Sequence, residues 1–357
     1  MDHALRRSAL TARLDDLGVD GVLVTALPNV RYLTGFTGSN GAVLVARDGA
    51  AFFTDGRYIE QSRHEVPDLD RVISTDGLDD GFAGPASRLG VRRLGIEASA
   101  ITLARHRRLD DRLADVELVP LDGAVEHGRR AKDADEIEAL RRAQAVTDEA
   151  FDEVLEVIEV GMSEQQLAVW LENALRRDGA HGLAFDPIVA FGESAAEPHH
   201  SPAHRFLEEG DVIKLDFGAR WDGYHADMTR TLAFGAPASE LRKIHDVVRQ
   251  AQQAGIDAVR AGVTTGDVDA AARRVIADAG YGDRFTHGLG HGVGLEIHEA
   301  PWLRPNTDEV LVAGAVVTIE PGVYVPGLGG VRVEDMVEVT DDGCRVLGAS
   351  TRELIEL

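Results

Sequence analysis

The stretch VIKLDFGARWDGYHADMTRT, residues 212–231, contains two strand-like runs on either side of a glycine-containing turn. Asp216 interrupts the apolar run of the first strand, and Asp227 stands eleven residues later, so a hairpin would bring the two carboxylates face to face. A carboxylate inside an apolar strand is costly unless it is paired or bound to a metal ion. The segment therefore predicts either a metal site between two strands or a pair of strand-end aspartates that cap turns.

A second segment, THGLGHGVGLEIHEAP (286–301), gathers His287, His291 and His298 among several glycines. Glycine lets the backbone approach a ligand closely. Histidine is the commonest neutral metal ligand and the usual proton shuttle. A lone histidine is more often structural, but three of them in one glycine-rich segment favour a functional site.

The third segment, VVTIEPGVYVPGLGGVRVEDMVEV (316–339), places Glu320 at the end of an apolar strand and Glu334 within an alternating run. The run predicts one strand over residues 331–339, whose valines face the core and whose other face carries Arg332, Glu334, Met336 and Glu338. Two acids on buried strands need charge compensation. An ion pair between Arg332 and Glu334 on a solvated face would account for those two residues but not for Glu320.

A fourth segment, EPHHSPAHRF (197–206), contains His199, His200 and His204. The three histidines are either a surface metal-binding tract or a means of placing one histidine over a site that is built elsewhere.

Taken together, the four segments offer four carboxylates and one histidine in strand contexts. Such an oxygen-rich set suits two Mn²⁺ ions, with Co²⁺ or Zn²⁺ as alternatives, which would activate a shared water and polarise a carbonyl group. The remaining histidines would shuttle protons and hold the tetrahedral intermediate.

Around these segments the chain predicts two domains, 1–125 and 126–357. The first alternates helices with short strands at 21–25, 41–46, 50–55, 94–98 and 116–120. In the second, an amphipathic helix that ends before Gly161 is followed by one that starts with a capping box at Ser163 and Gln166. A second helix pair is expected at 239–261 and 267–279, so the fold predicted is α+β, a mostly antiparallel sheet backed by helices with internal pseudo-symmetry.

Charge and composition exclude several classes of protein. The chain has 357 residues with 37 Lys and Arg against 61 Asp and Glu, a formal net charge of −24. An acidic balance of this size argues against nucleic acid or an anionic membrane as the main partner. The N-terminal stretch predicts a short amphipathic helix and no signal peptide, and Cys344 has no second cysteine for a disulfide. A cytoplasmic location is therefore expected.

The ligand candidates resemble the five-residue signature of the "pita-bread" metallopeptidases, family M24, at Asp216, Asp227, His291, Glu320 and Glu334. Their spacings of 11, 64, 29 and 14 residues fit the branch of Xaa-Pro peptidases that contains prolidase and aminopeptidase P. The motifs DFGA, GYHADMTRT, GHGVGLEIHE, TIEPGVY and GGVRVED fit as well, and NVRYLTGFTGSNGAVLV with FFTDGRY is similar to the creatinase/prolidase N-terminal domain. The resemblance covers essentially the whole chain and implies a pita-bread catalytic domain after a smaller α/β domain.

The resemblance also implies a role for each ligand. Asp216 would chelate one metal ion and Asp227 would bridge both. His291 and Glu320 would bind the other ion and Glu334 would bridge, while Glu320 would also accept the proton of the attacking, metal-bridging water.

Accessory residues are implied in the same way. His199, seventeen residues before Asp216, matches the histidine that contacts the scissile region, and His298 matches the one that stabilises the carbonyl oxygen. His287 and Arg332 match positions behind the ligands or at the end of the substrate. Many members have glycine where this chain has His200, and the spacing favours His199 for the catalytic role.

The function expected from the resemblance is a homodimeric exopeptidase with two metal ions that releases the residue before proline, an Xaa-Pro aminopeptidase. The alternative is an Xaa-Pro dipeptidase (prolidase) restricted to dipeptides, and the motifs do not separate the two. A metal-free hydrolase of the creatinase kind or a non-catalytic binding protein would be expected to lack some of the ligands, and here all five are present.

Overall fold

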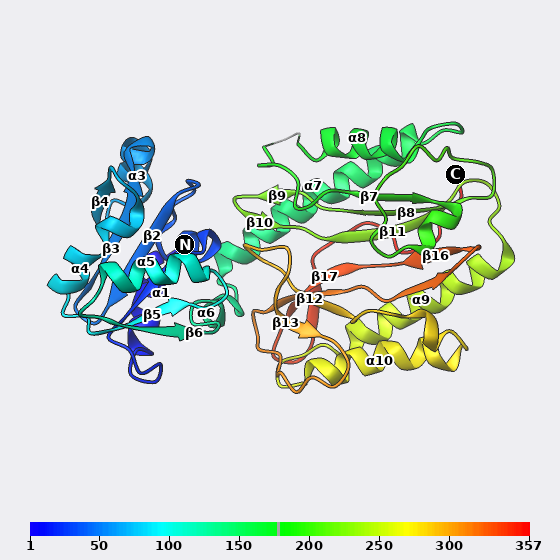
Figure 1. Cartoon of the computed structure of the whole chain (residues 1–357). Helices are drawn as coiled ribbons and strands as arrows, with labels where there is room; N and C mark the ends of the chain where they lie inside the picture. Colours follow the sequence, from blue (N-terminus) through cyan, green and yellow to red (C-terminus); the bar gives the residue numbers. More distant parts are fainter. Residues whose placement is uncertain (177–178) are drawn as a thin grey trace. The chain divides into compact units, whose positions relative to one another are not determined.

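The computed structural model of the chain describes residues 1–176 and 179–357 (Figure 1). The chain divides into two compact units, Met1–Arg129 and Arg130–Leu357. The boundary predicted from the sequence lies four residues earlier. Within the described ranges, each helix is too short or too polar to cross a membrane.

The first unit is a mixed sheet flanked by helices. Its six described strands lie in the order β4-β3-β2-β1-β5-β6. Strand β2 is antiparallel to its neighbours β1 and β3, and the other pairings are parallel. The strands are β1 (Gly21–Val24), β2 (Gly41–Ala46), β3 (Gly49–Asp55), β4 (Asp70–Ser74), β5 (Arg93–Glu97) and β6 (Glu117–Leu121). The helices are α1 (His3–Ala12), α2 (Leu27–Thr34), α3 (Ile59–Glu65), α4 (Ala83–Arg88), α5 (Leu103–Arg112) and α6 (Glu126–Arg129), with 3₁₀ turns η1 (Gly56–Tyr58) and η2 (Leu78–Gly81).

The five strands predicted in this unit are confirmed. The sheet buries most residues of the apolar runs in β1, β2, β3 and β5, whereas the edge strand β6 is only partly buried. Strand β4 is missing from the prediction. Its sequence, DRVIS, is short, begins with two charged residues and lies at the sheet edge. An edge strand is less apolar because one side of it faces solvent.

The second unit contains the predicted helix-backed antiparallel sheets. Its helices are α7 (Ala134–Val157), α8 (Glu164–Ala174), α9 (Ser239–Ala258) and α10 (Thr265–Asp278), with 3₁₀ turns η3 (Gly192–Ala196) and η4 (Gly282–Arg284). One sheet has the order β11-β8-β7, and another has the order β13-β12-β14-β17-β18. The strands are β7 (Ile188–Phe191), β8 (Val212–Phe217), β9 (Arg220–Trp221), β10 (Tyr224–His225), β11 (Met228–Ala233), β12 (Gly290–Gly292), β13 (Glu299–Leu303), β14 (Val316–Ile319), β15 (Gly322–Val325), β16 (Gly329–Arg332), β17 (Asp335–Val339) and β18 (Cys344–Val346).

Each sheet is packed against one helix pair. Helices α7 and α8 share a core with β7, β8 and β11, while α9 and α10 share another with β13, β14 and β17. In Figure 1 the two helix pairs lie on opposite sides of the strands of this unit. This repeat is the pseudo-symmetry expected from the sequence, and it leaves the strands of both sheets in the middle, where the candidate ligands lie.

Local sequence explains where the helices of this unit begin. The capping box predicted at Ser163 and Gln166 is present at the start of α8. Helix α7 begins with a second capping box, in which Asp133 and Glu136 each accept from the other residue's backbone N–H. Such reciprocal caps satisfy backbone donors that the first helical turn leaves open.

The predicted single strand over residues 331–339 is wrong. The chain leaves one sheet at Arg332, where β16 pairs with β15, and enters another at Asp335, where β17 pairs with β14. The valines of this segment are buried as predicted, but Met336 on the opposite face is buried as well. Alternation alone cannot reveal the change of partner, because both strands keep a period of two. The break places Glu334 between the two sheets.

Candidate metal centre

A pocket of about 310 Å³ lies within the second unit and collects the predicted site residues. Its lining comes from both sheets and from the segment that follows β7. The residues of the pocket that the sequence analysis names are His199, Asp216, Asp227, His287, His291, His298, Glu320, Arg332 and Glu334.

The hairpin predicted around Asp216 and Asp227 is present. Strand β8 pairs with β11 so that Asp216 is opposite Thr229, and Asp227 directly precedes β11. Both aspartates are buried. One oxygen of Asp216 accepts from Arg332, whereas its Oδ1 is buried and has no hydrogen-bond partner within the described part of the chain. A buried carboxylate oxygen without a donor is an open ligand position.

His291 on β12 is oriented as a neutral ligand. Its Nδ1 lies 3.0 Å from the carbonyl oxygen of Gly292, and because a carbonyl only accepts, Nδ1 carries the proton. The lone pair of Nε2 then points into the pocket, 3.5 Å from Asp227 Oδ2 and 3.4 Å from Glu320 Oε1. A hydrogen bond from the other ring nitrogen is the usual way in which proteins fix a metal-binding histidine.

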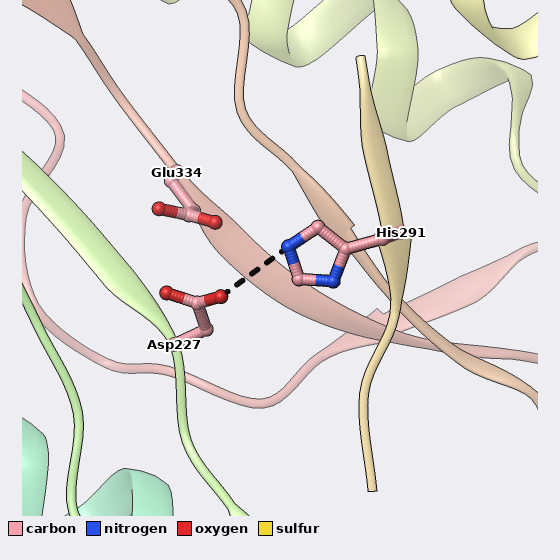
Figure 2. Close-up of side chains that lie close together, drawn as sticks. All are labelled: Asp227, His291 and Glu334. Atoms are coloured by element: carbon pink, nitrogen blue, oxygen red, sulfur yellow. Dashed lines mark ion pairs between the residues drawn. The ribbon is translucent and has the colours of Figure 1, made fainter. Parts of the chain in front are cut away.

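Asp227, His291 and Glu334 form the centre of the site. Each offers one ligand atom, and these atoms lie within 4.8 Å of one another. Figure 2 shows the three side chains pointing toward one another from separate segments. Thr229 Oγ1 donates to Glu334 Oε2 at 2.6 Å, and Thr318 Oγ1 donates to Glu320 Oε1 at 3.2 Å, so each glutamate is held by a neighbouring hydroxyl.

The electrostatics of the site favour bound cations. Burial, together with the neighbouring carboxylates, raises the pKa of Asp227 and of Glu334 well above their ordinary values. Burial also raises the pKa of Glu320 to about 7, although Arg332 opposes the shift. Like charges that are forced together out of water behave in this way, and a divalent cation among them would remove the penalty. Four carboxylates and one neutral imidazole therefore fit hard divalent metal ions.

Arg332 does not pair with Glu334, so the solvated ion pair considered from the sequence is wrong. The guanidinium is buried and donates to Asp216, to Thr229 Oγ1 at 2.9 Å and to Tyr324 Oη at 3.0 Å. It is the buried cation that balances Asp216 and orders the residues behind the ligands. Tyr324, which sequence reasoning missed as a site residue, lies within the TIEPGVY motif.

Two of the accessory histidines, His298 and His287, lie close to the candidate ligands. His298 lies against His291, with ring centroids 4.4 Å apart. His287 lies behind the ligands, where its Nδ1 donates to the Gly288 carbonyl and its Nε2 accepts from Tyr324 Oη at 2.9 Å. Burial lowers the pKa of His287 to about 4, so this histidine is neutral at pH 7.

The EPHHSPAHRF tract is not a surface metal site. His199 is exposed and lines the pocket. Its neighbour His200 instead contacts Glu164 Oε2 at 2.8 Å, and His204 lies at a different surface hollow. The tract therefore places one histidine over a site built elsewhere, which is the second of the two sequence interpretations.

Comparison with known proteins identifies the family. The model of metallopeptidase family M24 matches residues 138–341, and that of the creatinase/prolidase N-terminal domain matches residues 6–131. The chain belongs to metallopeptidase family M24. The M24 match spans all five candidate ligands, and the order of the two matches is the domain order expected from the sequence.

Individual M24 proteins are similar along the whole chain. The uncharacterized peptidase YqhT of Bacillus subtilis is 41% identical over 341 residues, which are 96% of this chain and 97% of that protein. A solved structure of an Xaa-Pro dipeptidase from Bacillus anthracis is 39% identical with a TM-score of 0.97, and both chains are covered completely. The X-Pro aminopeptidase from Thermotoga maritima is 35% identical with a TM-score of 0.90, covering 97% of this chain and 100% of that one.

Proposed function

We propose that this M24 peptidase hydrolyses Xaa-Pro bonds at the N-terminal end of short peptides with two divalent metal ions. The oxygen-rich ligand set favours Mn²⁺. The observation that carries the proposal is the convergence of three buried carboxylates, the partly buried carboxylate of Glu320 and one neutral histidine in a single pocket. The proposed ligands are Asp216, Asp227, His291, Glu320 and Glu334.

The bound ions would lower the pKa of a water molecule and polarise the scissile carbonyl group. Glu320 would take up the proton of that water, since its carboxylate lies at the pocket and is only partly buried. His298, next to His291, and His199 at the exposed side of the pocket would donate hydrogen bonds to the oxygen on which negative charge develops. Arg332 would hold the Asp216 carboxylate in place through their ion pair.

Xaa-Pro specificity has a physical basis. The bond before proline lacks an amide N–H, and the proline ring fixes φ. An enzyme that holds its substrate as a hydrogen-bonded strand would lose a contact at this position. The metal pocket described above requires no such contact, because it would bind the carbonyl oxygen.

Dipeptides are the substrate length that we propose first. A volume of about 310 Å³ is at the small end of ligand pockets. Arg304 lines this pocket, is exposed, and has no ion pair within the described residues, so its guanidinium is available to a substrate carboxylate. A dipeptide carries its C-terminal carboxylate on the proline, close to the scissile bond. The name of the similar Bacillus anthracis structure is consistent with this choice.

Release of the first residue from longer peptides, the aminopeptidase activity favoured by the sequence, is the second candidate. The similar Thermotoga maritima protein supports it. The homodimer, which the family resemblance implies, and the cytoplasmic location stay predictions.

Product analysis by mass spectrometry tests the two candidates. The Mn²⁺-loaded protein is incubated with an Xaa-Pro dipeptide and with an Xaa-Pro-Yaa-Zaa peptide. Cleavage of the dipeptide alone supports the dipeptidase, release of Xaa from the longer peptide supports the aminopeptidase, and no cleavage by metal-loaded protein refutes the Xaa-Pro assignment.

The variant Arg304→Met sharpens this test. Loss of a charge-assisted hydrogen bond worth about 1.5–3 kcal/mol should raise KM for the dipeptide by roughly 10- to 150-fold, with a smaller effect on kcat. Arg260→Met is the matched control, since Arg260 is exposed and does not line the pocket. An unchanged KM would contradict capture of the carboxylate by Arg304.

A further inference from the structure

His199 is carried by an irregular segment, Glu197–Ala203, which we call the His199 loop. The loop follows the 3₁₀ turn η3 and belongs to neither sheet. A side chain on such a segment is positioned only as well as the loop itself is held. The loop is nevertheless held by three buried charged side chains from other elements, which are Glu164, Lys214 and Arg332.

Glu164 is the first residue of α8, and its side chain is completely buried. Its Oε1 accepts from the backbone N–H of Phe191 at 2.9 Å, at the end of β7. Its Oε2 accepts from the N–H of Ala203 at 2.9 Å and contacts His200 Nε2 at 2.8 Å. One carboxylate thus connects the strand before the loop with two positions inside it.

His200 is the other half of this contact. Its second ring nitrogen, Nδ1, lies 2.9 Å from the exposed carboxylate of Glu197. Carboxylates accept but do not donate, so both contacts are made fully only by the imidazolium. Burial disfavours that charged form, but the hydrogen bonds to Glu197 and Glu164 outweigh burial and raise the pKa of His200.

The other end of the loop is fixed through its backbone. Lys214 on β8 is buried, and its Nζ donates to the carbonyl oxygens of Ala195 at 3.2 Å, of Glu197, and of Pro198 at 3.4 Å. Arg332 donates to the Pro198 carbonyl at 3.2 Å. His199 therefore lies between a carbonyl anchor on its N-terminal side and the Glu164–His200 contact on its C-terminal side.

We propose that His200 is a positioning residue, which with Glu164 fixes the His199 loop so that His199 faces the metal pocket. The catalytic part of this inference rests on the proposed function. Both ring nitrogens of His200 pair with residues outside the metal centre, Glu164 and Glu197, so His200 would act through His199 alone. Two consequences follow: loss of His200 should affect catalysis only when His199 is present, and it should loosen the loop whether or not the protein is an Xaa-Pro peptidase.

Kinetics of His199→Ala, His200→Ala and the double variant test the first consequence. A displacement of about 1 Å can cost up to about 10²-fold in rate, so His200→Ala should lower kcat substantially while its metal content stays that of the wild type. The double variant should be no slower than His199→Ala, because residues that act as one unit are not additive. His204→Ala, from the same tract but outside the pocket, is the matched control and should keep wild-type kinetics.

Hydrogen exchange of residues 195–203 tests the second consequence without turnover. Exchange should be faster in His200→Ala and in Glu164→Gln than in the wild type and in His204→Ala. His200→Ala is the milder change, since His200 is not fully buried, and it covers the case in which Glu164→Gln fails to fold. Unchanged exchange in a folded His200→Ala variant, or multiplicative losses in the double variant, would overturn the proposal. A wild-type protein that cleaves no Xaa-Pro peptide would refute the proposed function and leave the exchange result decisive for the loop.

Discussion

Replacing Glu320 by glutamine should have opposite effects on stability with and without metal. Glu320 is mostly buried, accepts from Thr318 Oγ1 and lies 3.4 Å from His291 Nε2. Glutamine keeps the shape of the side chain and an oxygen that can accept from Thr318. It removes a negative charge and a ligand oxygen, so it separates the electrostatic role of Glu320 from its packing.

The magnitude follows from the pKa of Glu320, which burial raises from 4.5 to about 7. Because the folded-state pKa is above the unfolded-state value, the contribution of this carboxyl group is fully present below about pH 4.5 and is lost as the pH rises through about 7. Each unit of pKa corresponds to about 1.36 kcal/mol. Metal-free wild type should therefore lose about 3 kcal/mol of unfolding free energy by about pH 8, and the variant should not lose it.

Bound metal should reverse the order of stability. A ligand present at 100 times its Kd adds about 2.7 kcal/mol to the unfolding free energy, and the variant, with one ligand fewer, should gain less. Urea unfolding measures the free energy of unfolding of the wild type and of the variant under four conditions, at about pH 5 and about pH 8, each in EDTA and in Mn²⁺. Glu208→Gln is the control, because Glu208 is exposed and does not line the pocket. If Glu320→Gln is no more stable than the wild type in EDTA at the higher pH, the reasoning from buried like charges is wrong.

Three further perturbations have defined outcomes. Asp227→Asn or Glu334→Gln should abolish hydrolysis and lower the amount of bound Mn²⁺ measured by elemental analysis, while the circular dichroism spectrum stays unchanged. Full activity in either variant would contradict the two-metal assignment. Lys132→Met should lower the free energy of unfolding in urea by about 3–5 kcal/mol, because it leaves the Glu299 carboxylate buried without the 2.8 Å ion pair. Adding Glu299→Gln should restore most of this loss. A cost near zero would show that the pair is solvated. Burial lowers the pKa of His245 to about 4, so stability should fall by up to about 3 kcal/mol as the pH drops from 6.5 toward 4, and His245→Leu should flatten this part of the stability profile if the assignment is right.

The grouping of the candidate ligands in one pocket was largely predictable because several of them stand out against their local pattern. A carboxylate in the apolar run of β8, an acid at the end of β14 and a histidine among glycines all violate the strand pattern. The hairpin that carries the two aspartates follows from its glycine turn, and the structure adds that Asp216 is opposite Thr229. Thr229 gave no signal of its own, since threonine is ordinary in a strand.

The supporting contacts were not predictable, because their partners are distant in sequence. Glu164 and His200 are 36 residues apart, and Lys132 and Glu299 are 167 residues apart. Each looks like a surface charge when read locally, and only the fold shows that Glu164, Lys132 and Glu299 are buried. The division of residues 331–339 between two sheets was missed for the related reason that strand pairing is a long-range property.

Charge balance explains why this site should hold metal ions. The pocket brings together four carboxylates, and the buried guanidinium of Arg332 forms its ion pair with one of them, Asp216. Without cations, the raised pKa values of Asp227, Glu320 and Glu334 mean that protons must take the place of the missing positive charge. Metal ions and protons therefore compete for the same oxygens, so metal affinity should rise steeply with pH through the neutral range. A metal affinity that does not change between about pH 6 and about pH 8 would be incompatible with a centre built from these three groups.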